Sequence, residues 1–426
     1  MPRGAAALRL PGVLVPATTS SPQSLAAPPP APASNRWPPI IWALLVATFV
    51  VRAAGFVYPY LPYRLDQLHL DTAVVSTVLA LWGVGWFTGQ LLCGWLADRV
   101  GRRATLVSAM SMAAVSFPLL AEARTPLALG AAAVVSGLVY DAPRPIVSAL
   151  VADTVSDEPG RARITGWRHF AVNLGAATTG LVGGALAEPV GISVLFWCNA
   201  VVCAAFAVVA FRVVPPPNSG HSLGNGAHRQ AFADPLLWLL WLASLLILIP
   251  VAALFSILPM MMAQDGLPPT AYGWTQAASA AAVIGLSPLL NPWLVRRARR
   301  TSPMLGLLST SGIILGAGMG SAGLASSTVG YGVAAVLAVP GEIIAFVAAT
   351  DVLNRIAPPT SRGVYAGIWG TTLAAAVLCA PVLGGWALAL GGHHLVALTT
   401  LMTGLLGAAL CLPLAALLHR PLRASA

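Results

Sequence analysis

Long apolar runs alternate with short polar or Pro/Gly-rich gaps over most of the chain. A helix that spans the hydrocarbon core of a bilayer needs about 20 mostly apolar residues. Cutting the sequence at charged clusters and at Pro/Gly breaks leaves twelve runs long enough for this. They cover residues 38–62, 72–97, 104–122, 126–152, 164–187, 190–213, 236–262, 271–295, 303–324, 328–355, 362–390 and 393–418. The pattern predicts an all-α integral membrane protein with twelve transmembrane helices.

The composition agrees with lipid as the solvent of most side chains. Hydrophobic residues make up 57% of the 426 residues, charged residues only 8%, and the mean hydropathy is +0.80. Soluble domains carry about 25% charged residues, so these values exclude a soluble fold. Segment 1–37, rich in Pro, Ala and Ser, is predicted to be a disordered N-terminal tail.

The basic residues indicate the orientation. All 23 are arginines, and the formal net charge is +10. Of the arginines in the gaps between the apolar runs, nearly all lie in alternate gaps, and the opposite gaps hold only Arg64 and Arg124, as the positive-inside rule requires. This distribution speaks against a nucleic-acid partner. We expect a multi-pass protein of the cytoplasmic (cell) membrane with both termini in the cytoplasm. Segment 214–235 is the expected cytoplasmic linker, and 419–426 is a C-terminal tail.

Several kinds of chemistry are not expected from this sequence. A chain without lysine has no P-loop, so we expect no ATP hydrolysis. The five cysteines form no CxxC pair, and the apolar runs hold no histidine cluster. We expect no enzyme activity, no cofactor and no metal site.

An internal repeat relates the two halves of the chain. The stretch "GAATTGLVGG" at 175–184 resembles "AVLCAPVLGG" at 376–385, a shift of 201 residues that also places Asp141 on Glu342. Nearer the start of each half, "GWLADRVGRR" falls on "PWLVRRARR" with a shift of 198 residues. The repeat predicts two pseudo-symmetric six-helix bundles, 38–213 and 236–418. Parallel repeats with a substrate site between them are a transporter architecture.

The charged turn after the second apolar run carries a recognisable motif. Its matches to the pattern G-x-L-a-D-r-x-G-r-r are Gly94, Leu96, Asp98, Arg99, Gly101, Arg102 and Arg103. In this place of a twelve-span plan the turn resembles the signature of the major facilitator superfamily, and the resemblance covers roughly residues 38–420. It implies that fold and a monomer that transports a small molecule.

The resemblance also implies a conformational latch. Asp98 would meet the start of the eleventh span near Arg362 and Gly363, where the helix dipole favours an anion, and hold the two halves in one state. Asp153 and Arg163 would join Arg103 in a cytoplasmic charge network. The alternative is that the turn only sets the topology.

A second family pattern, g-x-x-x-G-P-x-x-G-G, is partly present in the fifth span. Gly175, Gly183 and Gly184 match it, while Thr179-Gly180 stands where Gly-Pro is expected. In this the chain resembles the proton-coupled efflux branch of the family. Plain helix packing through small residues is the alternative.

Ionisable residues inside the predicted spans mark a candidate site, because each costs about 2.5–3.5 kcal/mol at the bilayer centre. They are Arg52, Asp141, Arg144, Arg168 and Glu342. Asp141 lies roughly 18 Å from the cytoplasmic helix end, and Glu342 takes the equivalent position. Burial favours the protonated form of a carboxylate, so both are proton-coupling candidates, Glu342 first.

The substrate-cavity candidates are Arg52, Arg144, Arg168 and Tyr140. Arg52 is expected to pair with Glu342 or to contact substrate. Arg144, three residues after Asp141 on the same helix face, alternatively neutralises Asp141. Pro59 and Pro62 predict a bend in the first span.

Together these features predict a secondary active transporter that exports a small molecule by proton-coupled alternating access, with substrate, protons and lipid as its partners. Proton-linked uptake of a nutrient and uniport are the alternatives within transport. A non-transporting receptor or scaffold is the alternative from another class.

Overall fold

The structure is a computed structural model that describes residues 37–155, 158–215, 230–298, 300, 302–358 and 361–419. The predicted N-terminal tail, most of the linker and residues 420–426 of the C-terminal tail lie outside the described residues. Met1–Trp37 and Pro38–Ala426 separate into two units, and the architecture below is that of the second.

The first half of this unit contains six spans. Its helices are α1 (Pro39–Ala53), α2 (Val57–Asp66), α3 (Thr72–Arg99), α4 (Arg102–Glu122), α5 (Pro126–Tyr140), α6 (Pro143–Thr154), α7 (Glu158–Ala187) and α8 (Ile192–Val213). The pair α1 and α2 forms the first span, and the pair α5 and α6 forms the fourth.

The second half repeats this plan. Its helices are α10 (Pro235–Ala253), α11 (Ile257–Gln264), α12 (Pro269–Ala298), α13 (Leu305–Gly320), the 3-10 turn η1 (Ser321–Leu324), α14 (Thr328–Ile356), α15 (Arg362–Gly370) and α16 (Thr372–His419). The seventh span consists of α10 and α11, and the eleventh begins with α15.

The described residues accommodate the twelve predicted spans. Ten segments are long and apolar enough to cross a membrane, and Pro126–Tyr140 is a shorter apolar helix that α6 extends. The segment Arg362–Leu418 has 57 residues, about twice the length of a span, and holds two spans. They meet at Gly392, whose φ of 60° belongs to the left-handed region that glycine adopts without strain.

Prolines interrupt the spans that come in two pieces. The first span breaks at residues 54–56, just before Pro59, which lacks the N–H that would bond to the carbonyl of Gly55. This confirms the predicted interruption and places it one turn earlier than the prolines themselves. The seventh span breaks at residues 254–256, ahead of Pro259, so the two halves share this feature.

The fourth span breaks at Asp141, immediately before Pro143. The main-chain carbonyl of Asp141 accepts hydrogen bonds from the Arg144 amide at 3.1 Å and from the side-chain amide of Gln90 at 3.3 Å. Irregular backbone at membrane depth requires such substitute donors. The break therefore places the buried Asp141 where the neighbouring helix α3 supports its main chain.

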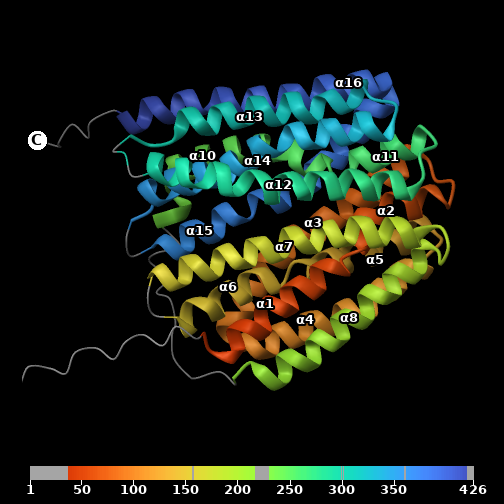
Figure 1. Ribbon diagram of the computed structural model, residues 1–426, viewed down its shortest axis with the longest axis horizontal. Helices are drawn as coiled ribbons and strands as arrows, with labels where there is room; N and C mark the ends of the chain where they lie inside the picture. The colour runs from red at the N-terminus through yellow and green to blue at the C-terminus, as the bar shows by residue number, and fades with distance from the viewer. Residues whose placement is uncertain are drawn as a thin grey trace, which may run out of the picture. The chain divides into compact units, whose positions relative to one another are not determined.

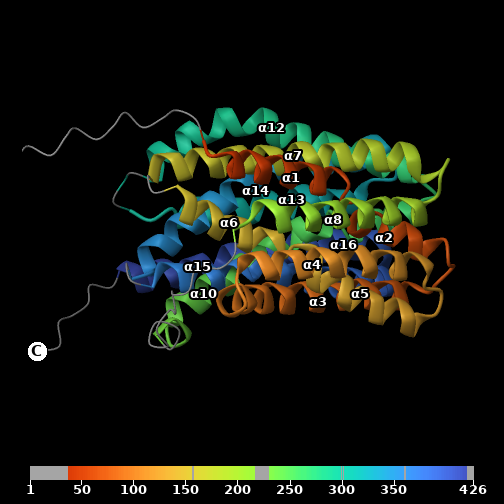
Figure 2. The same cartoon turned by 90° about the horizontal axis from the view of Figure 1, so that it is seen from below.

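Each half packs mainly within itself. In the first half α1 lies against α7, α3 against α5 and α4 against α8, and in the second α16 packs on both α10 and α13. Figures 1 and 2 show the first half in red to yellow-green and the second in green to blue. The halves meet where α7 packs on α12, α3 on α16 and α2 on α11.

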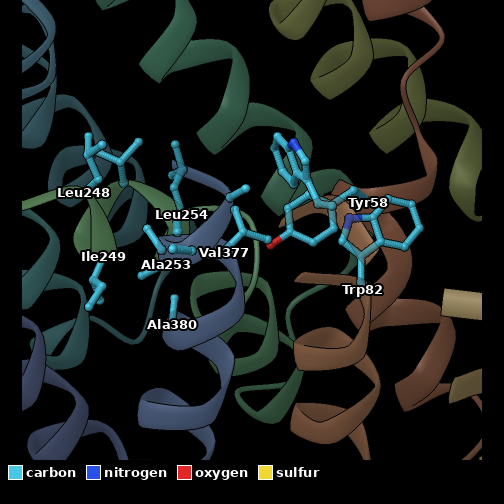
Figure 3. Close-up of a cluster of buried hydrophobic side chains, with 14 of the residues drawn as sticks. Tyr58, Trp82, Leu248, Ile249, Ala253, Leu254, Val377 and Ala380 are labelled. Carbon is cyan, nitrogen blue, oxygen red and sulfur yellow. The ribbon is translucent and has the colours of Figure 1, made fainter. Parts of the chain in front are cut away.

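A buried aromatic and aliphatic cluster joins the halves (Figure 3). The ring of Tyr58 stacks on Trp82 with centroids 5.4 Å apart, and it reaches Phe255 of the second half at 6.2 Å. Figure 3 shows Val377 of α16 beside Tyr58, with Leu254 next to them. This cluster closes the space between the halves around the broken first and seventh spans.

Candidate functional site

The spans have two distinguishable ends. The arginine-rich end carries the turns that follow α3, α12 and α14, near residues 99–103, 296–303 and 355–362. The opposite end carries the turns near residues 67–71, 188–191, 265–268 and 325–327.

Close glycine packing holds the halves together toward the opposite end. A Cβ built on Gly184 of α7 would lie 3.1 Å from the Cα of Gly273 on α12, and one on Gly180 would lie 2.8 Å from the Gly273 carbonyl oxygen. Between α3 and α16, Gly83 meets the backbone of Leu378 and Gly385 meets the side chain of Ser76. We call the contact between α7 and α12 and the contact between α3 and α16 together the seam.

Toward the arginine-rich end, several glycines of these spans have open space beside them among the described residues. A Cβ built on any of several glycines there would meet none of the described atoms within 4 Å. These glycines are Gly94 of α3, Gly166 of α7, Gly285 of α12, and Gly363, Gly367 and Gly370 of α15. Gly166 and Gly367 are equivalent positions of the repeat. We interpret this difference as a state that is closed at the seam and open at the arginine-rich end.

An ion pair links the breaks of the first and fourth spans. Arg52, in the last turn of α1, donates from Nη2 to Oδ1 of Asp141 at 2.8 Å, and the Asp141 side chain is only 4% exposed. Arg144 approaches the other carboxylate oxygen at 3.5 Å. Asp141 thus has two arginine partners. Arg52, which we expected at Glu342 or at substrate, is paired with Asp141.

Aromatic side chains surround this ion pair. The guanidinium of Arg52 lies 5.6 Å from the ring centre of Tyr140, and that ring makes edge contacts with Trp82 at 5.2 Å and Trp86 at 5.3 Å. A guanidinium near an aromatic face gains a cation–π attraction. Behind Arg52 and Tyr140, toward Asn199, lies a cavity of about 20 Å³ within the first half, enough space for one water molecule.

The remaining cavity candidates of the first half lie beside Asp141. Nη1 of Arg168 on α7 donates to the main-chain oxygen of Arg144 at 3.5 Å, and the Arg144 side chain is 41% exposed. The short helix α6 contacts both α3 and α7, the two helices that form the seam with the other half. Arg144 and Arg168 are thus placed beside the interface between the halves.

Glu342 lies near the middle of α14, which packs on α12 and α13. The preceding residue, Gly341, packs against Leu315 of α13. Glu342 is partly buried, and among the described residues none forms an ion pair or a hydrogen bond with it. The two carboxylates related by the repeat therefore differ: Asp141 has two arginine partners and Glu342 has none in the described part of the chain.

The latch residues are described only in part. Gly101, with a φ of 98°, forms the turn between α3 and α4, and Arg99 and Arg103 lie over the rings of Trp95 and Phe211 at 4.8 and 4.2 Å. The side chains of Asp98, Asp153 and Arg163 lie outside the described residues. Arg362 is exposed, and Gly363 faces open space. The expected contact between Asp98 and the start of α15 would require this end to be closed.

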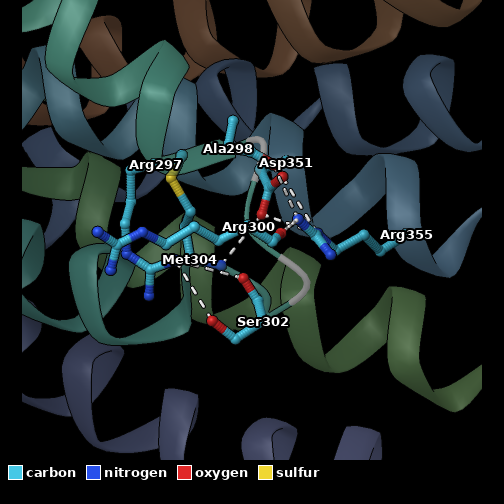
Figure 4. A network of polar contacts seen from close by, with 7 residues as sticks. All are labelled: Arg297, Ala298, Arg300, Ser302, Met304, Asp351 and Arg355. Atoms are coloured by element: carbon cyan, nitrogen blue, oxygen red, sulfur yellow. Dashed lines mark hydrogen bonds and ion pairs between the residues drawn. The ribbon is translucent and has the colours of Figure 1, made fainter.

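The second half has a polar network of its own at the arginine-rich end (Figure 4). Nε of Arg355 donates to Asp351 at 3.0 Å, and its Nη2 donates to the carbonyl oxygens of Ala298 and Arg300 at 3.1 and 2.8 Å. Asp351 also accepts from the amide of Met304 at 3.0 Å. Sequence reasoning missed this network, although the spacing of Asp351 and Arg355 is that of an i,i+4 helix pair.

Comparisons with known proteins agree with this architecture. The family model described as "Major Facilitator Superfamily" matches residues 43–376. The chain is 27% identical over 361 residues to "Multidrug resistance protein MdtH" of Aeromonas hydrophila, which covers 81% of this chain and 86% of that protein.

Two of the similar solved structures illustrate the fold. One is a POT family transporter in complex with a thioalcohol-conjugated peptide, with a TM-score of 0.72 at 13% identity, covering 88% of this chain and 94% of that one. The other is a bacterial homolog of the human lysosomal transporter Spinster, inward-facing and unoccupied, with a TM-score of 0.62 at 16% identity, covering 88% and 95%. At these identities the likeness concerns the fold alone.

Proposed function

Since the chain belongs to the Major Facilitator Superfamily of membrane transporters, we propose that it moves a small molecule across the membrane by proton-coupled alternating access. The observation that carries this proposal is the asymmetry between the two ends. Two repeated six-helix halves pack closely at the seam, have open space beside glycines at the arginine-rich end, and carry ionisable side chains within their spans. Rocking of the halves about this region would close one end and open the other.

The positive-inside rule supports an orientation for this state. It places the arginine-rich turns in the cytoplasm, so the described state is open to the cytoplasm, and both termini lie on that side. Closing this end would bring the turn of Asp98 toward Arg362, which supports the latch as part of the outward-facing state. Asp153 and Arg163 then belong to the charge network behind that turn.

Glu342 is the proposed proton carrier. Asp141 accepts from Arg52 at 2.8 Å and from Arg144 at 3.5 Å, so its carboxylate is engaged by two arginines. Glu342 has no such partner in the described part of the chain, so it is the intramembrane carboxylate that we assign to proton exchange during the cycle. A membrane potential supplies about 2.3 kcal/mol per charge per 100 mV for such a movement.

The substrate would bind between the halves, against Arg52, Tyr140, Arg144 and Arg168 of the first half. Export is the first candidate direction. It is supported by the name of the 27% identical relative, a multidrug resistance protein, and by the partial antiporter pattern of the fifth span. A second candidate is proton-linked uptake, since the solved structures of similar fold include transporters described as peptide transporters.

Inside-out vesicles test the proposal. They are energised so that the lumen is acid, and lumenal pH is followed as a cationic dye (ethidium), a neutral compound (chloramphenicol) and an anionic one (benzoate) are added. Proton-coupled export predicts that at least one compound dissipates the gradient in an expression-dependent way, and that Glu342→Gln abolishes the response. Glu188→Gln, an exposed carboxylate in a turn at the opposite end, is the matched control and should respond as the wild type does.

Two other outcomes decide against parts of the proposal. A gradient response that persists in Glu342→Gln removes this residue as the proton carrier. If no compound acts while intact cells accumulate a nutrient in an expression-dependent way, uptake replaces export.

A further inference from the structure

The fifth span forms hydrogen bonds with the first span on both sides of the break in the first span. Before the break, the hydroxyl of Thr179 donates to the main-chain oxygen of Arg52. After the break, the hydroxyl of Tyr60 donates to the main-chain oxygen of Gly180 at 2.8 Å. Adjacent residues of α7 thus hold the end of α1 and the start of α2, and the break between them has a defined geometry.

Close packing accompanies these hydrogen bonds. A Cβ built on Gly175 would lie 2.6 Å from the Cβ of Arg52, and one on Gly183 would fall on the ring of Tyr60. Thr179 itself is 5% exposed. The backbone of Arg52 therefore lies directly against α7, and its guanidinium extends from this fixed point to Asp141.

The other face of the same α7 segment forms the seam. Gly180 and Gly184 face Gly273 and its neighbours on α12, and Gln276 of α12 donates to the hydroxyl of Tyr272. That hydroxyl donates in turn to the main-chain oxygen of Leu254 at 3.3 Å, at the break of the seventh span. Residues 175–184 thus lie between the broken first span on one side and the second half on the other.

We propose that Thr179 is the positioning residue of the Arg52–Asp141 ion pair and makes this pair dependent on closure of the seam. While the seam is closed, α12 holds α7 against α1 and the Thr179 hydroxyl fixes the Arg52 backbone. When the seam opens, α12 leaves Gly180 and Gly184, and α7 is free to move away from α1. The inference rests on the proposed alternating access, and it assigns a specific role to the threonine that stands where the family pattern has the glycine of Gly-Pro.

The test measures how often the seam opens. Val377 of α16 is 1% exposed and lies beside Tyr58 at the junction of the halves (Figure 3). In a background with the five native cysteines replaced, Val377→Cys is labelled with a membrane-impermeant maleimide. Its rate follows the population of molecules with an open seam, because the closed state shields this position.

Thr179→Val keeps the shape of the side chain and removes the hydroxyl. It should raise the labelling rate about three- to tenfold, the effect of losing one hydrogen bond from the closed-seam state. Thr179→Ser retains the hydroxyl and should restore the rate to within about twofold of the parent. Thr178→Val is the matched control and should leave the labelling rate unchanged. Among the described residues, the Thr178 hydroxyl bonds only to the main-chain oxygen of Leu174 in its own helix.

The same substitution in an Asp141→Asn background tests whether Thr179 acts through the Arg52–Asp141 ion pair. In Asp141→Asn the ion pair is already weakened, so Thr179→Val should add little, as expected for residues that act through one interaction. Additive effects would overturn the role of Thr179 at the ion pair. If Thr179→Val lowers the melting temperature but leaves the labelling rate unchanged, the Thr179 contact is only structural and the proposal is overturned. A Thr179→Ser variant that labels as fast as Thr179→Val would also overturn it.

Labelling is done at one pH, without substrate and without a gradient. Its outcome is therefore independent of the Glu342→Gln experiment, which concerns proton coupling. Failure of the Thr179 proposal leaves the proposed function standing, and failure of proton coupling leaves the Thr179 result interpretable.

Discussion

Asp141 and Glu342 occupy equivalent positions of an internal repeat, yet their surroundings differ. Asp141 sits at a helix break with two arginine partners, while Glu342 lies within a continuous helix and has none among the described residues. The sequence revealed both carboxylates and the i,i+3 neighbour Arg144. It could not reveal Arg52 as the closer partner, because that contact joins residues 89 positions apart and depends on how α1 packs against the fourth span.

At the residue scale we predict that Asp141→Asn destabilises the protein. The substitution leaves Arg52 and Arg144 facing a neutral amide in a largely desolvated place, and breaking a buried ion pair costs about 3–5 kcal/mol. Because the Arg52 side chain is 29% exposed, we expect a loss at the lower end of that range, seen as a lower melting temperature in detergent. Asp66→Asn, at an exposed helix end, is the control. Equal melting temperatures for the two variants would contradict the predicted contribution of the Arg52–Asp141 ion pair to stability.

The helices follow the sequence closely because their ends are set by local features. Each predicted span corresponds to a helix or a broken pair, since hydropathy and charge clusters determine where a helix enters and leaves lipid. The breaks at Asp141 and near Leu254 were not predicted, although Pro143 and Pro259 mark them. A proline ends a helix only when neighbouring groups satisfy the freed carbonyls, and those neighbours are tertiary contacts.

At the element scale we predict different outcomes for alanine substitutions at two glycines of α7. In Gly180→Ala the new methyl group would lie 2.8 Å from the Gly273 carbonyl oxygen, so it should push α12 away and weaken the seam by about 1–3 kcal/mol. In Gly166→Ala the methyl group meets none of the described atoms within 4 Å and should be tolerated. Maleimide labelling of Val377→Cys reports both. Gly180→Ala should speed it, and identical rates in the two variants would show that the seam is not held by this close approach.

At the scale of the whole molecule, the sequence predicted the twelve-span architecture, the repeat and the family, but not the state. One sequence must support both an open and a closed arginine-rich end, so no pattern in it can select between them. The six glycines facing open space near that end, and the closely packed ones at the seam, became informative only through their surroundings. The network of Asp351 and Arg355 was likewise visible only when the turn after α12 was placed against α14.

The central claim is that protonation of Glu342 shifts the molecule between a state open at the arginine-rich end and one open at the opposite end. Spin-label distances measure this directly, with one pair at Gly166→Cys and Gly367→Cys and a second pair at Glu188→Cys and Ser326→Cys. As pH is varied in a background with the five native cysteines replaced and Glu342 retained, one distance should shorten while the other lengthens. Glu342→Gln in the same background should hold both at fixed values. Distances that change together, or an unaltered pH response in Glu342→Gln, would contradict the account.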